Sequence, residues 1–264
     1  MDLKERLRAL NGGRPVVALP PRRLAGIESV LAGREVATLL GNTYVVVEPD
    51  RGRPLDPAQA HDLAGDADGV LEVVSAGDED MRIIIWNPDG SQAELSGNGT
   101  RIAAAWLAEL TGARRISVRV GEREVVATVL ESGEIEQDLG EVHVDAPEVV
   151  DGIAFVPVSV GNPHAVVVGD PDEIQRLGPL LETHPRFPDR TNVQVVRLDG
   201  PGEVTARVWE RGVGETSSSG TSAVAVAAAT HGAGDVLVHF PGGDLRVRLE
   251  GGRARLTGPA ERVR

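Results

Sequence analysis

The stretch RIIIWNPDGSQAELSG at residues 82–97 recurs, with changes, as TARVWERGVGETSSSG at residues 205–220. In each copy an apolar run typical of a β-strand ends at a tryptophan, and a Ser-Gly pair follows ten residues later. The tryptophans are residues 86 and 209 and the serines are residues 96 and 219, so both pairs differ by 123 positions. An alanine-rich segment follows each Ser-Gly pair. This pattern predicts that one structural unit occurs twice in the chain.

A second pair of segments supports the repeat and sets the expected domain organisation. GNTYVVVEP at residues 41–49 resembles GNPHAVVVGDP at residues 161–171, and their first residues differ by 120 positions. Because the landmarks keep one order at nearly one offset, we expect two equivalent halves. The sequence predicts an N-terminal extension over residues 1–35, a first half over 36–145 and a second half over 146–264.

The expected fold class is α+β. Many short runs alternate apolar with polar residues, which is the period of a half-buried antiparallel strand. The alanine-rich segments predict helices over residues 100–110 and 221–231 that are apolar on nearly every side, so they should lie inside the protein and be enclosed by sheet. We therefore expect two pseudo-symmetric halves, each a mainly antiparallel sheet curled or closed around a central helix. Further helices are predicted over residues 2–10, 22–33 and 172–182.

Composition excludes several classes of function. The 264 residues carry a formal net charge of −13, which argues against nucleic acid or an anionic membrane as the main partner because both repel an acidic surface. The chain has no cysteine, so disulfides and thiol chemistry are excluded. The first residues carry both charges and no apolar core, unlike a signal peptide, and no apolar run approaches about 18 residues. We expect a cytoplasmic protein.

The two Ser-Gly corners are candidate ligand sites. Ser96 and Ser219 each stand where a helix N-cap is expected, and serine is a common N-cap for structural reasons alone. The glycines that follow leave backbone N–H groups uncovered, which suits a carboxylate or phosphate. Asn87 and the pair Glu210-Arg211 lie just upstream and should line the same cleft. Because Arg211 suits a carboxylate and Glu210 an ammonium, the combination suits a free amino acid.

These corners resemble the two catalytic motifs of the diaminopimelate epimerase family of cofactor-independent amino-acid racemases and epimerases. The resembling segments are NPDGSQAELSGNGTR and ERGVGETSSSGTSA, with GNPHAVVV, FPDRTNVQVV and DADGVLEVV as further blocks in the family's order. The resemblance covers roughly residues 41–248. It implies two pseudo-symmetric halves with the active site between them, no cofactor, and a homodimer.

The resemblance also implies roles for individual residues. Ser96 and Ser219 match the two catalytic positions, Glu210 and Arg211 match residues that hold the ammonium and the distal carboxylate of the substrate, and His164 matches a residue near the catalytic pair. Backbone amides at both corners match those that hold the α-carboxylate, and four asparagines match positions that bind the substrate's polar groups. The backbone amides are those of Gly97, Asn98, Gly99, Gly220 and Thr221, and the asparagines are Asn42, Asn87, Asn162 and Asn192.

The main departure from the family is chemical. Family members invert a stereocentre with two cysteine thiols, one on each face of the α-carbon, whereas this chain has serine at both positions. A thiol is moved toward neutrality by a helix N-terminus, but an alcohol is far less acidic and needs another base to activate it. The candidate bases are His164, Glu215 and Glu94. Thr43 also stands where the family usually has aspartate.

Three hypotheses follow from this departure. The first is an epimerase acting on an amino acid, most simply the conversion of LL- to meso-diaminopimelate, with natural or altered serines. The second is an elimination or isomerisation of an amino or hydroxy acid on the same scaffold, and the third is a binding protein without turnover. No nucleophile elbow, metal-ligand spacing among the six histidines or P-loop lysine occurs in the sequence, so we expect no metal and no nucleotide cofactor.

Overall fold

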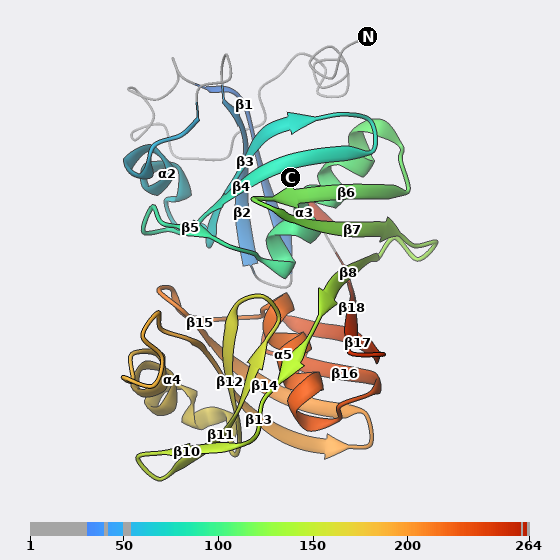
Figure 1. The fold of residues 1–264 in the computed structure, drawn as a ribbon. Helices are drawn as coiled ribbons and strands as arrows, with labels where there is room; N and C mark the ends of the chain where they lie inside the picture. Colours follow the sequence, from blue (N-terminus) through green and yellow to red (C-terminus); the bar gives the residue numbers. More distant parts are fainter. Residues whose placement is uncertain (1–30, 40–41, 50–53, 260, 263–264) are drawn as a thin grey trace.

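The computed structural model describes residues 31–39, 42–49, 54–259 and 261–262 (Figure 1). The helix predicted over residues 2–10 lies outside these residues, as does most of the helix predicted over 22–33. The last three residues of that second prediction, 31–33, are the start of a strand and not of a helix. A short apolar segment does not by its periodicity distinguish a helix from a strand.

The first half of the chain builds a curled sheet with one helix inside it and one outside (Figure 1). The helix Pro57–Ala64 (α2), which the sequence analysis did not predict, begins with a capping box in which the Asp56 side chain accepts from the Gln59 amide. The elements in chain order are β1 (Leu31–Leu39), β2 (Asn42–Pro49), α2, β3 (Gly69–Ala76), β4 (Asp80–Trp86), β5 (Gln92–Ala93), α3 (Gly97–Thr111), β6 (Arg115–Val120), β7 (Arg123–Val129) and β8 (Ile135–Glu141).

The second half repeats this order after two short strands, β9 (His143–Val144) and β10 (Glu148–Val150). Its elements are β11 (Ile153–Ser159), β12 (Pro163–Val168), a 3₁₀ turn η2 (Pro171–Glu173), α4 (Ile174–Glu182), β13 (Asn192–Gly200), β14 (Glu203–Glu210), β15 (Gly214–Thr216), α5 (Gly220–Thr230), β16 (Gly234–Phe240), β17 (Gly243–Glu250), β18 (Arg253–Gly258) and β19 (Glu261–Arg262). The predicted α+β class with two pseudo-symmetric halves is confirmed.

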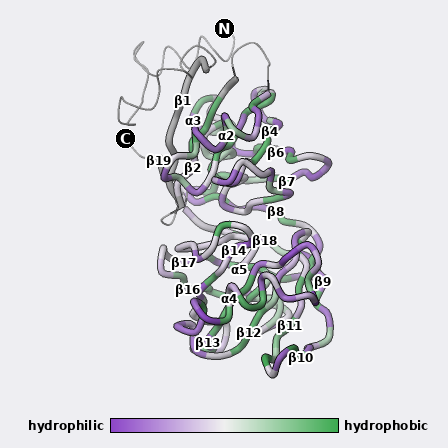
Figure 2. The backbone as a smooth tube through the Cα atoms, turned by 90° about the vertical axis from the view of Figure 1, so that its left-hand side faces the viewer, coloured by the Kyte–Doolittle hydropathy of each residue, from purple (hydrophilic) through white to green (hydrophobic). Residues whose placement is uncertain are grey.

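Strand pairing repeats between the halves as well. Most strand pairs are antiparallel, and the parallel pairs β2–β3 and β4–β6 recur as β12–β13 and β14–β16. The two expected sheets are joined into one, because β8 pairs with β7 of its own half and also with β18 of the other. Figure 2, which views the molecule from the side, shows the two halves stacked with β8 between them.

The central helices lie where the sequence predicts them. Helix α5 is enclosed by the second-half sheet, and nine of its eleven residues are buried among valines, leucines and alanines. Helix α3 occupies the same place in the first half among Ile83, Ile85 and Ile116. A helix that is apolar all round is stable only when a sheet covers every side. This packing fixes the helix axes and so fixes where their N-termini lie.

A tryptophan–glutamate hydrogen bond supports each half. The two tryptophans stand at matching positions of the repeat, but the glutamates come from different elements, Glu72 from β3 and Glu182 from the end of α4. The Trp86 indole donates to Glu72 at 2.8 Å, and the Trp209 indole donates to Glu182 at 2.7 Å. Glu182 also accepts the Gly212 amide at 2.7 Å. Because Gly212 follows the predicted ligand Arg211, this carboxylate fixes the loop that carries one wall of the site.

Candidate active site

The N-termini of α3 and α5 meet directly between the two halves. A Cβ placed on Gly97 would lie 2.9 Å from the Gly220 Cα, and one on Gly220 would lie 2.9 Å from the Gly97 Cα. Both glycines are therefore required by a backbone contact that leaves no room for a side chain. The residues just before them, Ser96 and Ser219, therefore stand at the ends of two helices in contact, and of these two serines Ser96 lines the pocket described next. The contact also brings together the positive ends of two helix dipoles.

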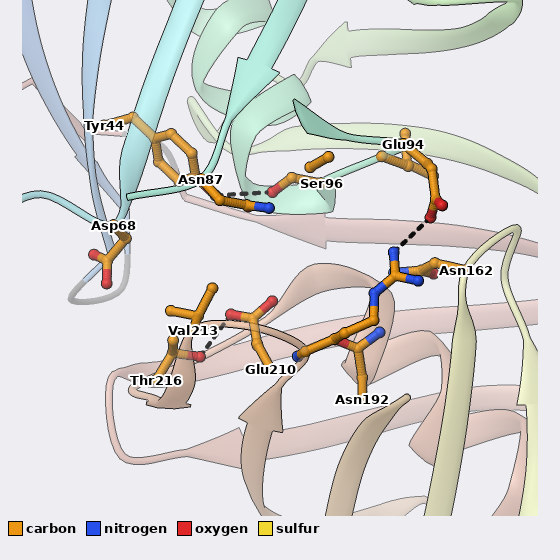
Figure 3. Close-up of a pocket in the computed structure, with 13 residues that line it drawn as sticks. Tyr44, Asp68, Asn87, Glu94, Ser96, Asn162, Asn192, Glu210, Val213 and Thr216 are labelled. Carbon is orange, nitrogen blue, oxygen red and sulfur yellow. Dashed lines mark hydrogen bonds and ion pairs between the residues drawn. The ribbon is translucent and has the colours of Figure 1, made fainter. Parts of the chain in front are cut away.

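A pocket lies beside these corners, with walls from both halves (Figure 3). The first half contributes Ser96 and Tyr44, and the second contributes Glu210 and Arg211. Six predicted site residues line it, namely Asn87, Ser96, Asn162, Asn192, Glu210 and Arg211. The other lining residues are Tyr44, Asp68, Ala93, Glu94, Leu95, Val213 and Thr216. The lining is predominantly polar and charged, as expected of a site for a zwitterion.

Ser96 uses its hydroxyl oxygen as a hydrogen-bond acceptor. It is the N-cap of α3 and accepts the Gly99 amide at 3.0 Å. The Tyr44 hydroxyl lies 3.1 Å from the same oxygen. Since the Gly99 amide is engaged by this cap, it is not available for the α-carboxylate role that the family resemblance gave it.

Ser219 uses its hydroxyl in the opposite way. It stands at the N-cap position of α5 without making a side-chain cap, and it donates to Glu210 Oε2 at 3.2 Å. Glu210 Oε1 accepts from the Thr216 hydroxyl at 2.6 Å. Burial raises the pKa of Glu210 above its usual range, the two hydroxyl donors oppose that shift, and the charge of Asp68 adds to it. A carboxylate with this pKa is suited to accept a proton.

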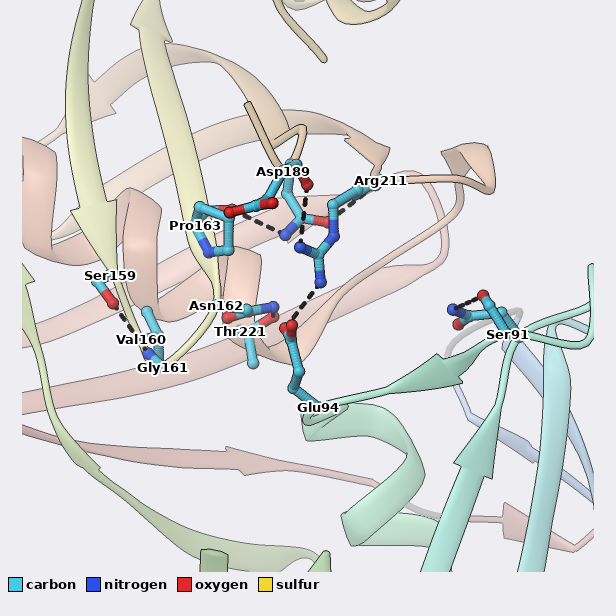
Figure 4. A network of polar contacts seen from close by, with 12 residues as sticks. Ser91, Glu94, Ser159, Val160, Gly161, Asn162, Pro163, Asp189, Arg211 and Thr221 are labelled. Carbon is cyan, nitrogen blue, oxygen red and sulfur yellow. Dashed lines mark hydrogen bonds and ion pairs between the residues drawn. The ribbon is translucent and has the colours of Figure 1, made fainter. Parts of the chain in front are cut away.

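Arg211 reaches across the pocket to the first half (Figure 4). Its guanidinium contacts Glu94 Oε2 at 2.7 Å, and its other terminal nitrogen donates to the Asp189 carbonyl at 3.3 Å. The Arg211 backbone amide donates to Asn192 Oδ1 at 3.0 Å. A substrate carboxylate would compete with Glu94 for the same cation.

The asparagines of the pocket are held by their neighbours. Asn162 donates to the Thr221 hydroxyl at 3.4 Å, which connects the pocket wall to the first turn of α5. Asn192 donates to the Pro163 carbonyl at 2.9 Å, and Asn87 donates to the Ser91 hydroxyl at 3.0 Å. The side chain of Asn42 lies outside the described residues.

His164 is not part of the pocket lining. Its side chain is buried and donates to Asn162 Oδ1 at 2.9 Å, while Gln194 donates to its other ring nitrogen at 3.0 Å. Burial lowers the pKa of His164 to about 3, although the Gln194 hydrogen bond opposes the shift. The ring is therefore neutral, and its hydrogen bond orients the Asn162 side chain, which lines the pocket. With so low a pKa, His164 is unsuitable as the base proposed from sequence.

The other two candidate bases are engaged in ion pairs. Glu215 contacts Arg207 at 2.6 Å and does not line the pocket. Glu94 does line it, paired with Arg211. The predicted residue Asn98 is buried, and its side chain donates to the Ser218 carbonyl at 3.2 Å, so it ties the two corners together.

Sequence reasoning missed Tyr44 and Asp68. Tyr44 lies within TYVVVE, whose apolar character predicts a core strand and gives no sign of a hydroxyl in a site. Asp68 belongs to a block quoted for the resemblance, and its carboxylate accepts the Thr43 amide at 2.7 Å. Burial raises the pKa of Asp68. Among the described residues no cluster of three or more histidine or acidic side chains could hold a metal ion.

Comparison with known proteins decides the family. The family model for diaminopimelate epimerase matches residues 36–144 and 156–263. The chain belongs to the diaminopimelate epimerase family. Diaminopimelate epimerases from Desulforudis audaxviator and Synechocystis are each 36% identical to this family member, over 85% of its chain and 94% of theirs. It is thus an isomerase by family.

Solved structures share the fold of this diaminopimelate epimerase family member at low identity. A hydroxyproline epimerase from Agrobacterium vitis with bound trans-4-hydroxy-L-proline superposes with a TM-score of 0.62 at 18% identity, covering 87% of this chain and 88% of its own. A phenazine biosynthesis protein of the PhzF family from Enterococcus faecalis gives 0.64 at 12% identity, covering 88% and 96%. No helix in the described part of the chain is long and apolar enough to span a bilayer.

Proposed function

We propose that the protein is a cofactor-independent epimerase that interconverts LL- and meso-diaminopimelate by moving a proton between the two faces of one α-carbon. The relatives named for this reaction and a pocket with carboxylate- and ammonium-binding groups support the substrate. The resemblance also favours a homodimer, which sedimentation equilibrium would test.

The observation that carries the proposal is the opposite hydrogen bonding of the two serines. The Ser219 proton is directed at Glu210, and no donor among the described residues occupies the lone pairs of the hydroxyl oxygen. That oxygen can therefore accept an α-proton as its own proton moves to the carboxylate. The Ser96 oxygen accepts a backbone amide, so its proton is available to a carbanion on the other face. Together they form a base and an acid without thiols.

The same geometry supports a set of proposed substrate contacts. Arg211 would exchange Glu94 for the distal carboxylate, since a charge-assisted pair with arginine suits a carboxylate. The Glu210 carboxylate has about four lone-pair positions and can take the α-ammonium beside its two hydroxyl donors. The first amides of the two helices, at Gly97, Asn98, Gly220 and Thr221, would receive the α-carboxylate, and the asparagines the remaining polar groups.

The test is proton exchange in heavy water. Incubation with LL-diaminopimelate should place deuterium at one α-carbon and produce the meso isomer. The double variant Ser96→Cys with Ser219→Cys should raise this rate by orders of magnitude, because thiols ionise far more readily than alcohols. Binding without any exchange would refute the epimerase. An unchanged rate in the double variant would remove both serines from the mechanism.

A second candidate function is elimination or isomerisation of an amino or hydroxy acid. The pocket carboxylate Glu210 favours it, because a single base with raised pKa is sufficient to start such a reaction. The shared fold with a methylitaconate-delta-isomerase, at a TM-score of 0.51 and 15% identity, fits this alternative. A new carbon–carbon double bond in the product, seen by NMR, distinguishes it from epimerisation.

A further inference from the structure

We propose that Tyr44 is a proton-relay residue on the side of the substrate α-carbon that faces Ser96. It passes its phenolic proton to Ser96 as Ser96 protonates the substrate. This inference rests on the proposed epimerase function. It assigns a chemical role to a side chain that the sequence analysis did not single out.

The hydrogen bonds of Ser96 leave one arrangement that frees its proton. A serine hydroxyl has one proton and two acceptor positions. The Gly99 amide at 3.0 Å fills one acceptor position, and the Tyr44 hydroxyl at 3.1 Å lies where it can fill the other. With Tyr44 as donor, both acceptor positions are filled, and the Ser96 proton is left for a ligand in the pocket that both residues line.

The electrostatic surroundings make Tyr44 a donor. Burial raises the pKa of the Tyr44 phenol, and the charges of Glu210 and Asp68 raise it further, while the hydrogen bond to Ser96 acts the other way. The phenol is therefore protonated at neutral pH. It can replace the proton that leaves Ser96, but it does not compete with Glu210 as the base.

The ring of Tyr44 is fixed in place by the fold. Tyr44 pairs with Gly69 across β2 and β3, and a Cβ on Gly69 would lie 2.9 Å from the Tyr44 ring carbon Cε1. The glycine thus makes space for the ring, and only 9% of Tyr44 is exposed. A ring held by packing delivers its hydroxyl to one position, as proton transfer requires.

Comparison of matching positions in the two halves shows that only Ser96 has a tyrosine partner. The shift of 120 positions between the Gly-Asn segments places Tyr44 opposite His164. His164 contacts Asn162 and Gln194, and Ser219 receives its support from Glu210 instead. Each serine thus has one ionisable partner, a phenol on one face and a carboxylate on the other.

The protons taken up and released in one turnover balance. On one face the α-carbon–hydrogen bond breaks, its proton goes to Ser219, and the Ser219 proton goes to Glu210. On the other face the Ser96 proton forms the new carbon–hydrogen bond, the Tyr44 proton replaces it, and Tyr44 becomes a phenolate. Water in the pocket then carries a proton from Glu210 to Tyr44, and both return to their starting states.

The experiment measures each epimer separately in heavy water with Tyr44→Phe. Two rates are followed, the loss of the α-proton and the appearance of the opposite epimer. Inversion should fall about 100-fold in both directions, the lower end of what a positioned acid or base contributes. For the epimer whose α-proton faces Ser219, the rate of α-proton loss should stay near that of the wild type. For the epimer whose α-proton faces Ser96, the rate of α-proton loss should fall as far as the rate of inversion. A purely structural role would slow both losses equally, and that result would overturn the inference.

Two further variants separate this inference from the function on which it rests. In a Ser96→Cys background the thiol needs no relay, so Tyr44→Phe should cost less than about 10-fold. An equal cost in both backgrounds would overturn the relay. Wild-type protein that exchanges no α-proton in either epimer would instead refute the epimerase.

The chain contains one tyrosine, so biosynthetic 3-fluorotyrosine alters this position alone. Its more acidic phenol should speed inversion a few-fold if Tyr44 gives up its proton in the slow step. An unchanged inversion rate would count against the relay.

Discussion

The two corners of the molecule share a sequence frame and differ in the chemistry of their partners. Ser96 accepts a backbone amide and faces a phenol, whereas Ser219 caps nothing and donates to a carboxylate. The offset of 123 positions places Asn87 opposite Glu210, so the charged group is present in one half only. A duplicated scaffold has therefore been differentiated by the neighbours of its serines and not by the serines themselves.

This difference bears on how two alcohols can serve as the acid and the base of the proposed reaction. A helix N-terminus favours an anion by about 0.3–1 kcal/mol in ordinary cases, far too little to ionise a serine. A hydroxyl becomes useful when a second group takes or supplies its proton during the reaction. In the mechanism we propose, Glu210 performs the first task and Tyr44 the second.

The strongest test of the comparison is Glu210→Gln. The amide keeps the shape but cannot take the Ser219 proton, so we expect the inversion rate to fall by roughly 10²- to 10⁴-fold. Loss of the α-proton should be impaired for the epimer whose proton faces Ser219. Thr216→Val removes the other hydroxyl donor to Glu210 and should cost less than about 10-fold. Equal losses in the two variants would contradict the base assignment.

The next test moves the N-termini of α3 and α5 apart. Gly220→Ala places a methyl group 2.9 Å from Gly97 Cα and 2.8 Å from Leu256 Cδ2, so the helices must move apart. A misplacement of about 1 Å costs on the order of 100-fold in rate, and overpacking costs roughly 1–3 kcal/mol of stability. Gly200→Ala is the matched control, because a Cβ there meets nothing within 4 Å. Wild-type turnover in Gly220→Ala would show that the contact is not needed.

Much of this arrangement can be predicted from local sequence. The repeat predicts the two central helices, because an alanine-rich segment after each Ser-Gly pair has the composition of an enclosed helix. Pocket residues such as Asn87 and Arg211 are also found, since they stand at a fixed distance from those corners.

Other features depend on contacts that local patterns do not encode. The pairing of β8 with β18 joins Gln137 to Leu256, more than 100 residues away, and nothing in IEQDLGE specifies its partner. Tyr44 was missed because a tyrosine in a valine-rich strand has the periodicity of core. The Glu94–Arg211 ion pair joins residues of opposite halves and depends on how the halves close.

That ion pair allows a test in which two variants act in opposite directions. Arg211→Ala should raise the KM for a substrate with a distal carboxylate by about 10- to 100-fold, the scale of a lost charge-assisted bond. Glu94→Gln should lower that KM by up to about 5-fold, because a competing pair with a partly exposed carboxylate is worth at most about 1 kcal/mol. Neutral amino acids should respond to neither change. A rise in KM in both variants would show that Glu94 binds substrate itself.

The smallest expected effect concerns the ring opposite Tyr44 in the repeat. Burial lowers the pKa of His164 to about 3, so the folded protein keeps this ring neutral while the unfolded chain binds a proton below about pH 6.5. Stability is therefore full above about pH 6.5 and is lost as the pH falls from there toward 3. Between pH 6.5 and 5 the loss from this group is at most about 2 kcal/mol.

Urea unfolding of His164→Gln at these two pH values measures that contribution. The variant should lose less stability on acidification than the wild type, and His143→Gln, which removes an exposed imidazole, should match the wild type. Equal slopes in wild type and His164→Gln would mean that His164 is not buried as a neutral ring. At acidic pH the second half would then hold a cation next to Asn162, whereas the phenol of Tyr44 at the matching position of the first half stays neutral.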